Sequence, residues 1–261
     1  MSAPNQIPEH LAMEFTLNGR IPVYDYYFND VVPESSISWS NSYLKSFIDR
    51  FSLTNIKIGQ SGWEPYGGAA KLHSQAFEKY IDFIKDKKVA VIGSQSPWIE
   101  AILVNYGAKT VTTVEYNVPI CDNNIIKAIS YKDFCNSSEK YDAIVSYSSI
   151  EHSGLGRYGD PLNPNGDIQT MEMIYRSLNK DGLCFLGVPV GVDALVWNAH
   201  RIYGQIRIKL MFSDKFKEID WIGCDKNHIY NLPLAKGSIF PTPKGSPEDI
   251  QPIIFLIKKN I

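Results

Sequence analysis

The chain has 261 residues, which is enough for one large domain or two small ones. Its composition, 44% hydrophobic and 21% charged, is typical of a globular protein with a sizeable core and excludes a disordered chain. The formal net charge of -2 gives no electrostatic reason to expect a nucleic acid or an acidic membrane as a partner.

Four widely spaced cysteines form no CxxC pair, so we expect reduced thiols and neither a disulfide framework nor a metal site. They are Cys121, Cys135, Cys184 and Cys224. Residues 1–20 lack the apolar run of a secretion signal. The most apolar window, residues 182–197, is too short to span a membrane and contains Pro189 and Asp193. The sequence therefore predicts a cytoplasmic protein without membrane contact.

Residues 1–85 are rich in aromatic side chains and are predicted to form an N-terminal cap over a later sheet. A packing extension with no ligand role is the alternative. A helix is expected to begin at Ser38 or Ser40, because apolar residues follow at helical spacing. The stretch GWEPYGG, residues 62–68, is rich in turn-forming residues, and residues 70–86 have the pattern of a second helix.

From Lys88 onward, strands and helices alternate, which predicts right-handed crossovers and a mainly parallel sheet in a second domain, residues 86–261. The expected strands are residues 88–93, 110–116, 125–131, 141–149, 183–191, 216–222 and 253–257. The expected helices are residues 96–106 and 168–178, the second of which is stopped by residues 179–182. The proline-rich segment 231–251 is expected to be an excursion before the last strand.

The turn after the first of these strands, GSQSPW at residues 93–98, joins a strand to a helix. Such a turn brings backbone N–H groups close to a ligand, although only Gly93 of a full G-x-G-x-x-G pattern is present. Glu115 ends the next strand about 20 residues later, where a carboxylate can accept hydrogen bonds from both ribose hydroxyls of an adenosine-containing cofactor. The alternative is that Glu115 is only a polar strand end.

Residues 141–166 continue a buried strand into a loop that is rich in ionisable groups and glycine. Open α/β sheets bind ligands at the carboxyl ends of their strands, so this loop is a candidate site. His152 titrates near neutral pH and is the candidate base, and Glu151 is expected either to orient it or to contact a cofactor. The alternative is a surface loop with a structural histidine.

Ile150-Glu151-His152 follows the fourth strand, and Lys180-Asp181-Gly182-Leu183 precedes the fifth. These two motifs resemble those of class I S-adenosylmethionine-dependent methyltransferases. More narrowly, EHSGLGRYGDPLNPNGD, WNAHRIYG, GRIPVYDYY and GWEPYGG resemble an uncharacterised methyltransferase-like family of nematodes and bacterial polysaccharide gene clusters. The first motif departs from the superfamily pattern, since it lacks two glycines and its preceding acidic residue.

The resemblance implies a Rossmann-like sheet of seven mostly parallel strands, with helices on both faces and a final antiparallel strand. It implies that S-adenosyl-L-methionine binds at the glycine turn, with Glu115 on the ribose and Tyr116 beside the adenine. Asp133 lies where the superfamily often has an acidic contact to adenine. The cofactor-binding candidates are Gly93, Ser94, Gln95, Glu115, Tyr116, Asp133, Ser148, Ser149 and Glu151.

The segment WNAHRIYG, residues 197–204, offers His200 as a second candidate base. Arg157, Arg201 and Arg207 could clamp a phosphate or carboxylate of the acceptor with their guanidinium groups. Alternatively they form internal salt bridges, for instance between Arg157 and either Asp160 or Asp167. Tyr158 and Asp160 are expected either to shape the loop or to contact the substrate. The substrate-binding candidates are Arg157, Tyr158, Asp160, Asn198, Arg201 and Tyr203.

The sequence thus favours a methyltransferase that uses S-adenosyl-L-methionine and acts on a small molecule. The resemblance suggests a sugar, a nucleotide-sugar or a phosphorylated metabolite, methylated on oxygen or nitrogen, in carbohydrate biosynthesis. Two alternatives stay open. One is a methyltransferase-like protein that binds without catalysis, and the other is an NAD(P)-dependent oxidoreductase on the same fold.

Overall fold

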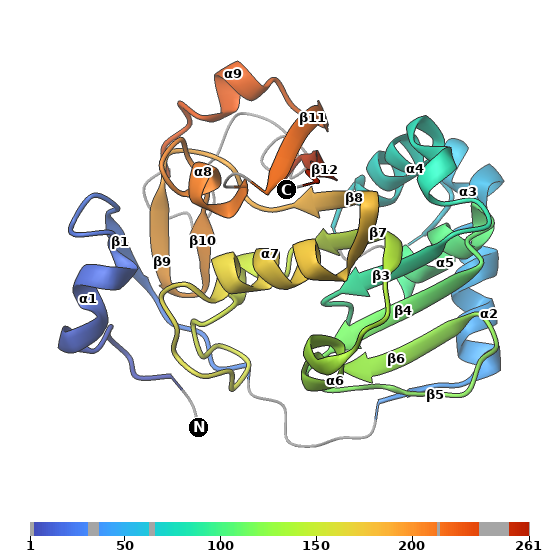
Figure 1. Ribbon diagram of the computed structural model, residues 1–261, viewed down its shortest axis with the longest axis horizontal. Coiled ribbons are helices and arrows are strands. Elements are labelled where there is room, and N and C mark those ends of the chain that lie inside the picture. Colours follow the sequence, from blue (N-terminus) through green and yellow to red (C-terminus); the bar gives the residue numbers. More distant parts are fainter. Residues whose placement is uncertain (1–2, 31–36, 63–65, 213–214, 235–250, 261) are drawn as a thin grey trace.

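Seven strands form one sheet in the order β11-β12-β8-β7-β3-β4-β6 (Figure 1). We describe a computed structural model over residues 3–30, 37–62, 66–212, 215–234 and 251–260. The strands are β3 (Lys88–Ile92), β4 (Thr110–Glu115), β6 (Ile126–Ser130), β7 (Tyr141–Tyr147), β8 (Leu178–Gly187), β11 (Phe216–Ile222) and β12 (Ile253–Lys258). Strand β12 is antiparallel to both neighbours, whereas β6, β4, β3, β7 and β8 are parallel. The predicted fold class, including the antiparallel last strand, is confirmed.

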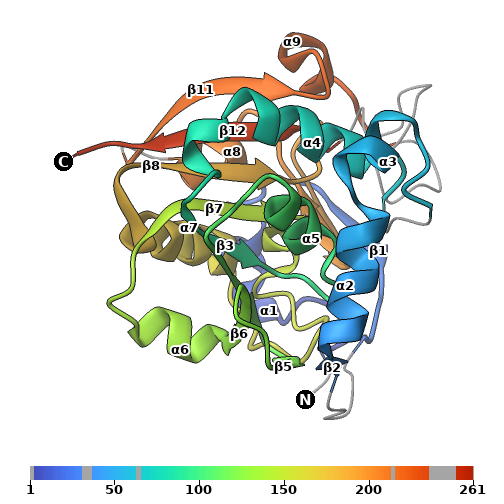
Figure 2. The ribbon, with the colours of Figure 1, turned by 90° about the vertical axis from the view of Figure 1, so that its right-hand side faces the viewer.

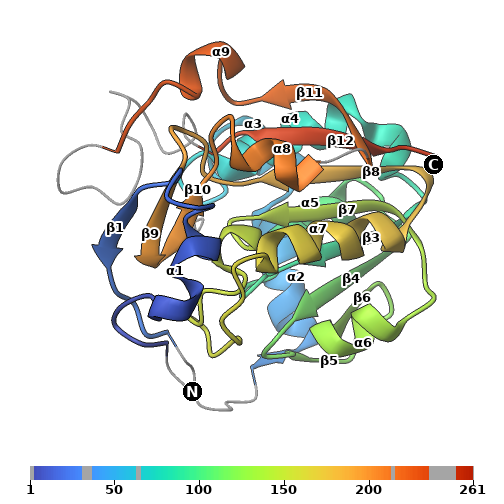
Figure 3. The same cartoon turned by 60° about the vertical axis from the view of Figure 1, so that its left-hand side comes forward.

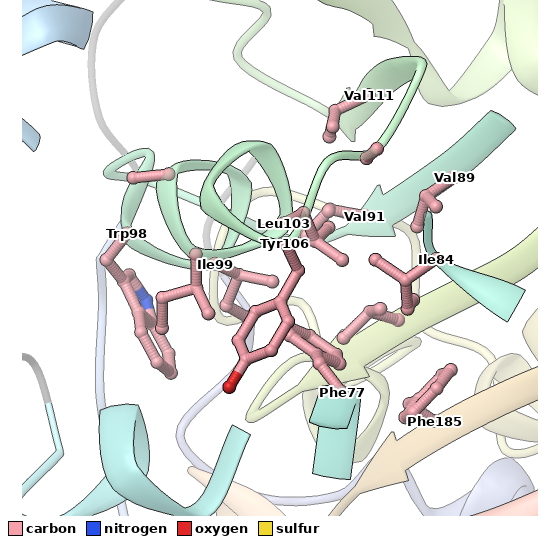
Figure 4. Packing of buried hydrophobic residues seen from close by; sticks show 14 of the residues in the cluster. Phe77, Ile84, Val89, Val91, Trp98, Ile99, Leu103, Tyr106, Val111 and Phe185 are labelled. Atoms are coloured by element: carbon pink, nitrogen blue, oxygen red, sulfur yellow. The ribbon is translucent and has the colours of Figure 1, made fainter. Parts of the chain in front are cut away.

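Helices cover both faces of this sheet, which explains why its central strands are continuous apolar runs. One face carries α2 (Asn41–Arg50), α3 (Leu53–Lys57), α4 (Ala69–Lys79) and α5 (Trp98–Asn105), and the other carries α6 (Tyr131–Asn136), α7 (Gly166–Ser177) and α8 (Arg207–Phe212) (Figure 2). Alternation along β3 places Val89 and Val91 in the first apolar cluster and Ala90 and Ile92 in the second. Figure 4 shows the first cluster, in which Val89 and Val91 lie among the side chains of α4 and α5.

Three of the N-terminal aromatic residues belong to the same core as the sheet. Trp39, Phe47 and Phe51 are buried in one cluster with β3 and α5. Helix α2 begins beside Ser40, whose Oγ accepts the N–H of Tyr43 at 3.2 Å, in agreement with the predicted start. The second predicted helix ends early, at Lys79, and a short 3₁₀ turn follows. The domain boundary after residue 85 stays a prediction.

A second, three-stranded sheet was not predicted. It consists of β1 (Val23–Tyr26), β9 (Ala194–Asn198) and β10 (His200–Ile202), in the order β1-β9-β10, and α1 (Glu9–Phe15) lies beside it (Figures 1 and 3). Strand β1 pairs in parallel with β9, so that Val23 stands opposite Leu195. The segment WNAHRIYG therefore contributes strands to a separate sheet. A third pair, β2 (Ser38–Trp39) with β5 (Ile120–Cys121), joins the N-terminal region to the segment after β4.

Several predicted boundaries differ from the structure. Strand β8 begins at Leu178, directly after α7, so residues 179–182 belong to the strand instead of forming a stop before it. The same strand ends at Gly187, before the predicted end at residue 191. The sequence also gave no indication of α6 or of α9 (Lys226–Ile229).

The predicted excursion at 231–251 falls mostly on residues 235–250, and part of GWEPYGG falls on residues 63–65; both stretches lie outside the described residues. Within the described part of the chain, no helix has the length and apolar character needed to cross a membrane.

Candidate active site

One cavity of about 540 Å³ opens where β3, β4 and β7 end. Because these neighbouring strands are parallel, their carboxyl ends meet at one edge of the sheet. The cavity thus brings together both segments that the sequence singled out, the glycine turn and the loop after β7. The predicted site residues that line it are Gly93, Ser94, Gln95, Glu115, Tyr116, Ser148, Ser149, His152, Tyr158 and Asp160.

Other lining residues were missed. Six of them lie within or next to the segments that the sequence singled out, although no site role was predicted for them: Ser96, Trp98, Asn117, Pro119, Tyr147 and Ser153. The remaining three, Ile37, Trp39 and Tyr66, come from the N-terminal region; Tyr66 lies in the GWEPYGG motif, but no ligand role was predicted for it. The indole Nε1 of Trp39 is buried and has no hydrogen-bond partner among the described residues.

The glycine turn packs directly against the start of the loop after β7. Gly93 has φ +78°, and a Cβ atom at this position would lie 1.9 Å from Oγ of Ser149. Glycine is therefore required here both for the backbone conformation and for the close approach of Ser149. The next residue, Ser94, is buried, and its hydroxyl donates to the carbonyl of Ser96 at 2.9 Å and to Oε2 of Glu100 at 3.0 Å.

Glu115 ends β4 with its carboxylate at the cavity. Its Oε2 accepts the backbone N–H of Tyr116 at 3.0 Å. Burial raises the pKa of Glu115 to about 6, so the carboxylate is mostly ionised at neutral pH. Tyr116 stacks on Tyr131, with ring centroids 5.2 Å apart.

His152 is held in one tautomer. It lies in the 3₁₀ helix η2 (Ile150–His152), and its Nδ1 is 2.7 Å from the carbonyl oxygen of Ala199. Because a carbonyl can only accept, Nδ1 carries the proton and Nε2 has a free lone pair. Burial, together with the nearby Arg157 and His200, lowers the pKa of His152 well below its usual value. The imidazole is therefore neutral at physiological pH.

Glu151 lies behind His152 and not on the cavity wall. Its side chain is 1% exposed, and its Oε1 is 3.8 Å from Nε2 of His152. Since His152 is neutral, this contact is not an ion pair in the resting protein. Among the described residues, Oε2 of Glu151 has no hydrogen-bond partner. Burial raises the pKa of Glu151 to about 7, so a fraction of the carboxyl is protonated at neutral pH.

Asp160 shapes the loop that carries these residues. Its Oδ2 accepts the backbone N–H groups of Gly154 at 2.7 Å and Gly156 at 3.2 Å, and its Oδ1 accepts that of Tyr158 at 3.3 Å. Of the two roles left open by the sequence, the hydrogen bonds support loop shaping, although Asp160 also reaches the cavity.

Arg157 has a different ionic partner from those predicted. Its Nε donates to Asp30 at 2.7 Å, and its guanidinium lies over the rings of Phe28 and Tyr158, at 4.3 and 5.1 Å from their centroids. The neighbouring Tyr158 lines the cavity, but Arg157 does not.

Arg201 and Tyr203 are also engaged inside the protein. Both are buried against Asp167, which accepts a hydrogen bond from the Tyr203 hydroxyl at 3.0 Å and lies 3.7 Å from Nε of Arg201. Arg207 completes the cluster with two hydrogen bonds to the Asp167 carboxylate, at 2.6 and 2.7 Å. Arg201 further donates to the Ser153 carbonyl at 2.6 Å. Arg201 and Arg207, which were predicted to bind a phosphate or carboxylate of the acceptor, thus bind Asp167 and hold the loop after β7 in place.

Three other candidates lie away from the cavity wall. Asn198 is fully buried and its Oδ1 accepts the N–H of Phe28 at 2.7 Å. His200 is buried, with its ring centroid 6.2 Å from that of His152. Asp133 is exposed in the first turn of α6, where its N–H donates to Oγ of the capping Ser130 at 3.0 Å. Within the described residues, no three His, Cys, Asp or Glu side chains gather as a metal site requires.

Comparisons with solved structures identify the fold. The N-methyltransferase NodS from Bradyrhizobium japonicum WM9, in complex with S-adenosyl-L-homocysteine, aligns with TM-score 0.50 and 11% identity over 85% of this chain and 100% of NodS. A Listeria monocytogenes protein assigned to the S-adenosylmethionine-dependent methyltransferases aligns with TM-score 0.48 and 11% identity over 73% of this chain and 100% of its own.

A Streptococcus mutans protein assigned to the same class aligns with TM-score 0.43 and 12% identity over 70% of this chain. The present chain spans about half, 48%, of the length of that protein. At 11% identity and a TM-score of 0.50, the likeness to NodS establishes the fold alone.

A comparison with curated protein sequences finds no match. Residues 86–233, more than half of the chain, match the family described as "Caenorhabditis protein of unknown function, DUF268". The predicted relation to a nematode family is confirmed, whereas the link to bacterial polysaccharide gene clusters stays a prediction. The chain belongs to the DUF268 family.

Proposed function

We propose that the protein is an S-adenosyl-L-methionine-dependent methyltransferase that acts on a hydroxyl group of an uncharged small molecule, such as a sugar. One observation carries the proposal. The turn at Gly93, the carboxylate of Glu115 and the free Nε2 of His152 belong to a single cavity at the carboxyl ends of β3, β4 and β7. A cofactor site and a candidate base therefore face the same space.

The lining fits this cofactor. The volume of about 540 Å³ lies within the range of roughly 300–1,000 Å³ that is usual for small-molecule sites. Glu115 can accept hydrogen bonds from the ribose hydroxyls, and the backbone of residues 93–95 can approach the methionine part. The buried Nε1 of Trp39, unpartnered within the described residues, is a donor available to a ligand.

The charge of the lining supports an uncharged acceptor. No lysine or arginine of the described residues lines the cavity, while the carboxylates of Glu115 and Asp160 do. A phosphorylated acceptor or a nucleotide-sugar would meet these carboxylates without a guanidinium or ammonium partner. The hydroxyl groups of Tyr66 and Tyr158 and the neutral His152 suit the hydrogen-bonding groups of a sugar.

The lining residues suggest how a hydroxyl would be activated. S-adenosyl-L-methionine supplies, when bound, an electrophilic methyl group. Nε2 of His152 would accept the proton of the attacking hydroxyl, since it is unprotonated in the resting protein. Buried imidazolium is unfavourable beside Arg157, so the carboxyl of Glu151, 3.8 Å from Nε2, would stabilise the charge that forms. The cavity walls would hold donor and acceptor in line, which can supply much of the rate.

Isothermal titration calorimetry with S-adenosyl-L-methionine and S-adenosyl-L-homocysteine tests the cofactor. We expect binding by the wild-type protein and at least about tenfold weaker binding by Glu115→Ala, because hydrogen bonds to a charged group are lost. Absence of heat from both ligands at saturating concentration would overturn the proposal. Quenching of NADH fluorescence is the matched control, and NADH binding without S-adenosyl-L-homocysteine binding would favour an oxidoreductase.

A further inference from the structure

Glu100 is a fully buried carboxylate behind the glycine turn. It lies in the first turn of α5, directly after the turn, and is 0% exposed. Its two oxygens accept hydrogen bonds from different elements. The hydroxyl of Ser94, in the turn, donates to Oε2 at 3.0 Å, and the hydroxyl of Thr113, in β4, donates to Oε1 at 2.7 Å. One side chain therefore ties the turn, the helix and the strand together.

The same arrangement reaches Glu115. The backbone N–H of Ser94 favours the ionised carboxylate of Glu115 and opposes the rise in its pKa, while the Ser94 hydroxyl donates to Glu100. Thr113, which also donates to Glu100, lies two residues before Glu115 in β4. Ser94 thus lies between two carboxylates, one buried and one at the cavity. Displacement of Ser94 would move an N–H group that favours the ionised carboxylate of Glu115.

The composition of the turn explains why such a brace is needed. Glycine-rich turns approach a ligand with bare backbone, but this turn has only Gly93, followed by Ser94, Gln95 and Ser96. Burial of an unpaired carboxylate costs free energy, so an apolar side chain would suit this position better if it served only to fill space. The charge is retained at a position where it contacts the turn and the strand that carries Glu115.

We propose that Glu100 is a positioning residue for the cofactor site, which holds Ser94 and, through it, the Glu115 carboxylate in the orientation that receives the ribose. The inference rests on the proposed function and deepens it. Glu100 touches neither the cavity nor a reacting group, so its effect is transmitted through Ser94 and Thr113.

The groups around Glu100 set the pH at which this brace weakens. Burial raises its pKa to about 7; the Thr113 and Ser94 hydroxyls oppose the shift and the Glu115 carboxylate adds to it. Cys121, in β5, also interacts electrostatically with Glu100. Above about pH 7 the carboxylate is ionised, and its two oxygens accept the two hydroxyl hydrogen bonds. Below this pH one oxygen carries a proton and becomes a donor, so the hydrogen bond that it accepts is weakened.

Titration of S-adenosyl-L-homocysteine into wild type and Glu100→Gln, from pH 6.5 to 8.5, tests the inference. We expect wild-type affinity to rise several-fold across this range and the variant to bind about five- to tenfold more weakly at pH 8, because its amide can accept only one of the two hydrogen bonds. We expect little change with pH in the variant. Thr112→Val is the matched control, since Thr112 is the buried neighbour of Thr113 on the other face of β4.

Amide hydrogen exchange provides a second readout that needs no ligand. Glu100→Gln should increase exchange at residues 93–97 and leave exchange in α7 unchanged. If Glu100→Gln does not fold, Ser94→Ala and Thr113→Val replace it, and each should show part of the same increase. Equal affinity, equal pH dependence and equal exchange in variant and wild type overturn the inference while the proposed function stands. If the wild-type protein binds no S-adenosyl-L-homocysteine, the proposed function is overturned instead. Amide exchange at residues 93–97 then still shows whether Glu100 holds the turn in place.

Discussion

The two halves of the cavity differ in what their ionisable residues do. On the side of β3 and β4, Glu115 faces the cavity directly. On the side of the loop after β7, Arg157, Arg201 and Asp160 bind other parts of the protein. The first half rests on regular strands, whereas the second is a long loop whose backbone groups need partners. Charged residues near a site can therefore serve the loop that forms it instead of the ligand.

The Asp167 cluster shows how this support is built. Burial alone would raise the pKa of Asp167, but Arg201 and Arg207 outweigh it and lower the pKa. Arg201 also donates to backbone carbonyls of Ser153, Asn163 and Pro164 at 2.6–3.3 Å. The cluster thus connects β10 and α8 to both ends of the loop that begins with His152.

Replacement of His152 gives the sharpest test of the residues that face the ligand, since His152 lines the cavity from the loop after β7. His152→Ala should reduce methyl transfer by roughly two to four orders of magnitude and leave binding of S-adenosyl-L-homocysteine unchanged, because a general base is lost. Transfer of labelled methyl to a panel of unphosphorylated sugars is the measurement. His200→Ala is the matched control and should retain most of the rate, since His200 is buried away from the cavity wall. The reverse pattern would move the role of base to His200.

The scaffold half should respond in stability. Asp167→Asn leaves two buried guanidinium groups without their carboxylate, and we expect a loss of about 3–5 kcal/mol in the free energy of unfolding, measured with urea. Asp30→Asn breaks the more exposed pair with Arg157 and should cost less than about 1 kcal/mol. Equal losses of unfolding free energy in the two variants would contradict the distinction between the buried ion pairs of Asp167 and the more exposed pair of Asp30 with Arg157.

Glu151, which lies behind His152 in the loop after β7, is predicted to lower stability at high pH. Burial raises its pKa from 4.5 to about 7, so the folded protein holds this proton more tightly than the unfolded chain. The associated stability is present at low pH and is lost as the pH rises from about 4.5 through 7. Glu151→Gln should therefore be about 1–3 kcal/mol more stable than wild type at pH 8 and equal to it near pH 4. A stability difference that does not vary with pH would contradict this explanation.

The parts of the site that follow from local spacing could be predicted from the sequence. Gly93 and Glu115 are fixed by one β–α–β unit, and Ser148, Ser149 and His152 closely follow a buried strand. Their positions at the cavity need no knowledge of distant contacts.

The parts that depend on distant contacts could not be predicted. An acidic residue in the first turn of a helix, such as Glu100, is ordinarily exposed, and its burial depends on Thr113 in the next strand. Asp133 was aligned to a cofactor contact, but it lies in the first turn of α6, which Ser130 caps, and it does not line the cavity. Arg201 lies close to Asp167 because it belongs to β10 of the second sheet, which was not predicted.

The pairing of β1 with β9 has a consequence for folding during synthesis. About 170 residues separate the two strands, so β1 leaves the ribosome long before its partner exists. At about 5–20 residues per second, the tyrosine-rich segment 23–27 waits roughly 10–35 seconds for β9. The sheet that buries Trp197 against Phe15 is thus completed late, after most of the parallel sheet has been made.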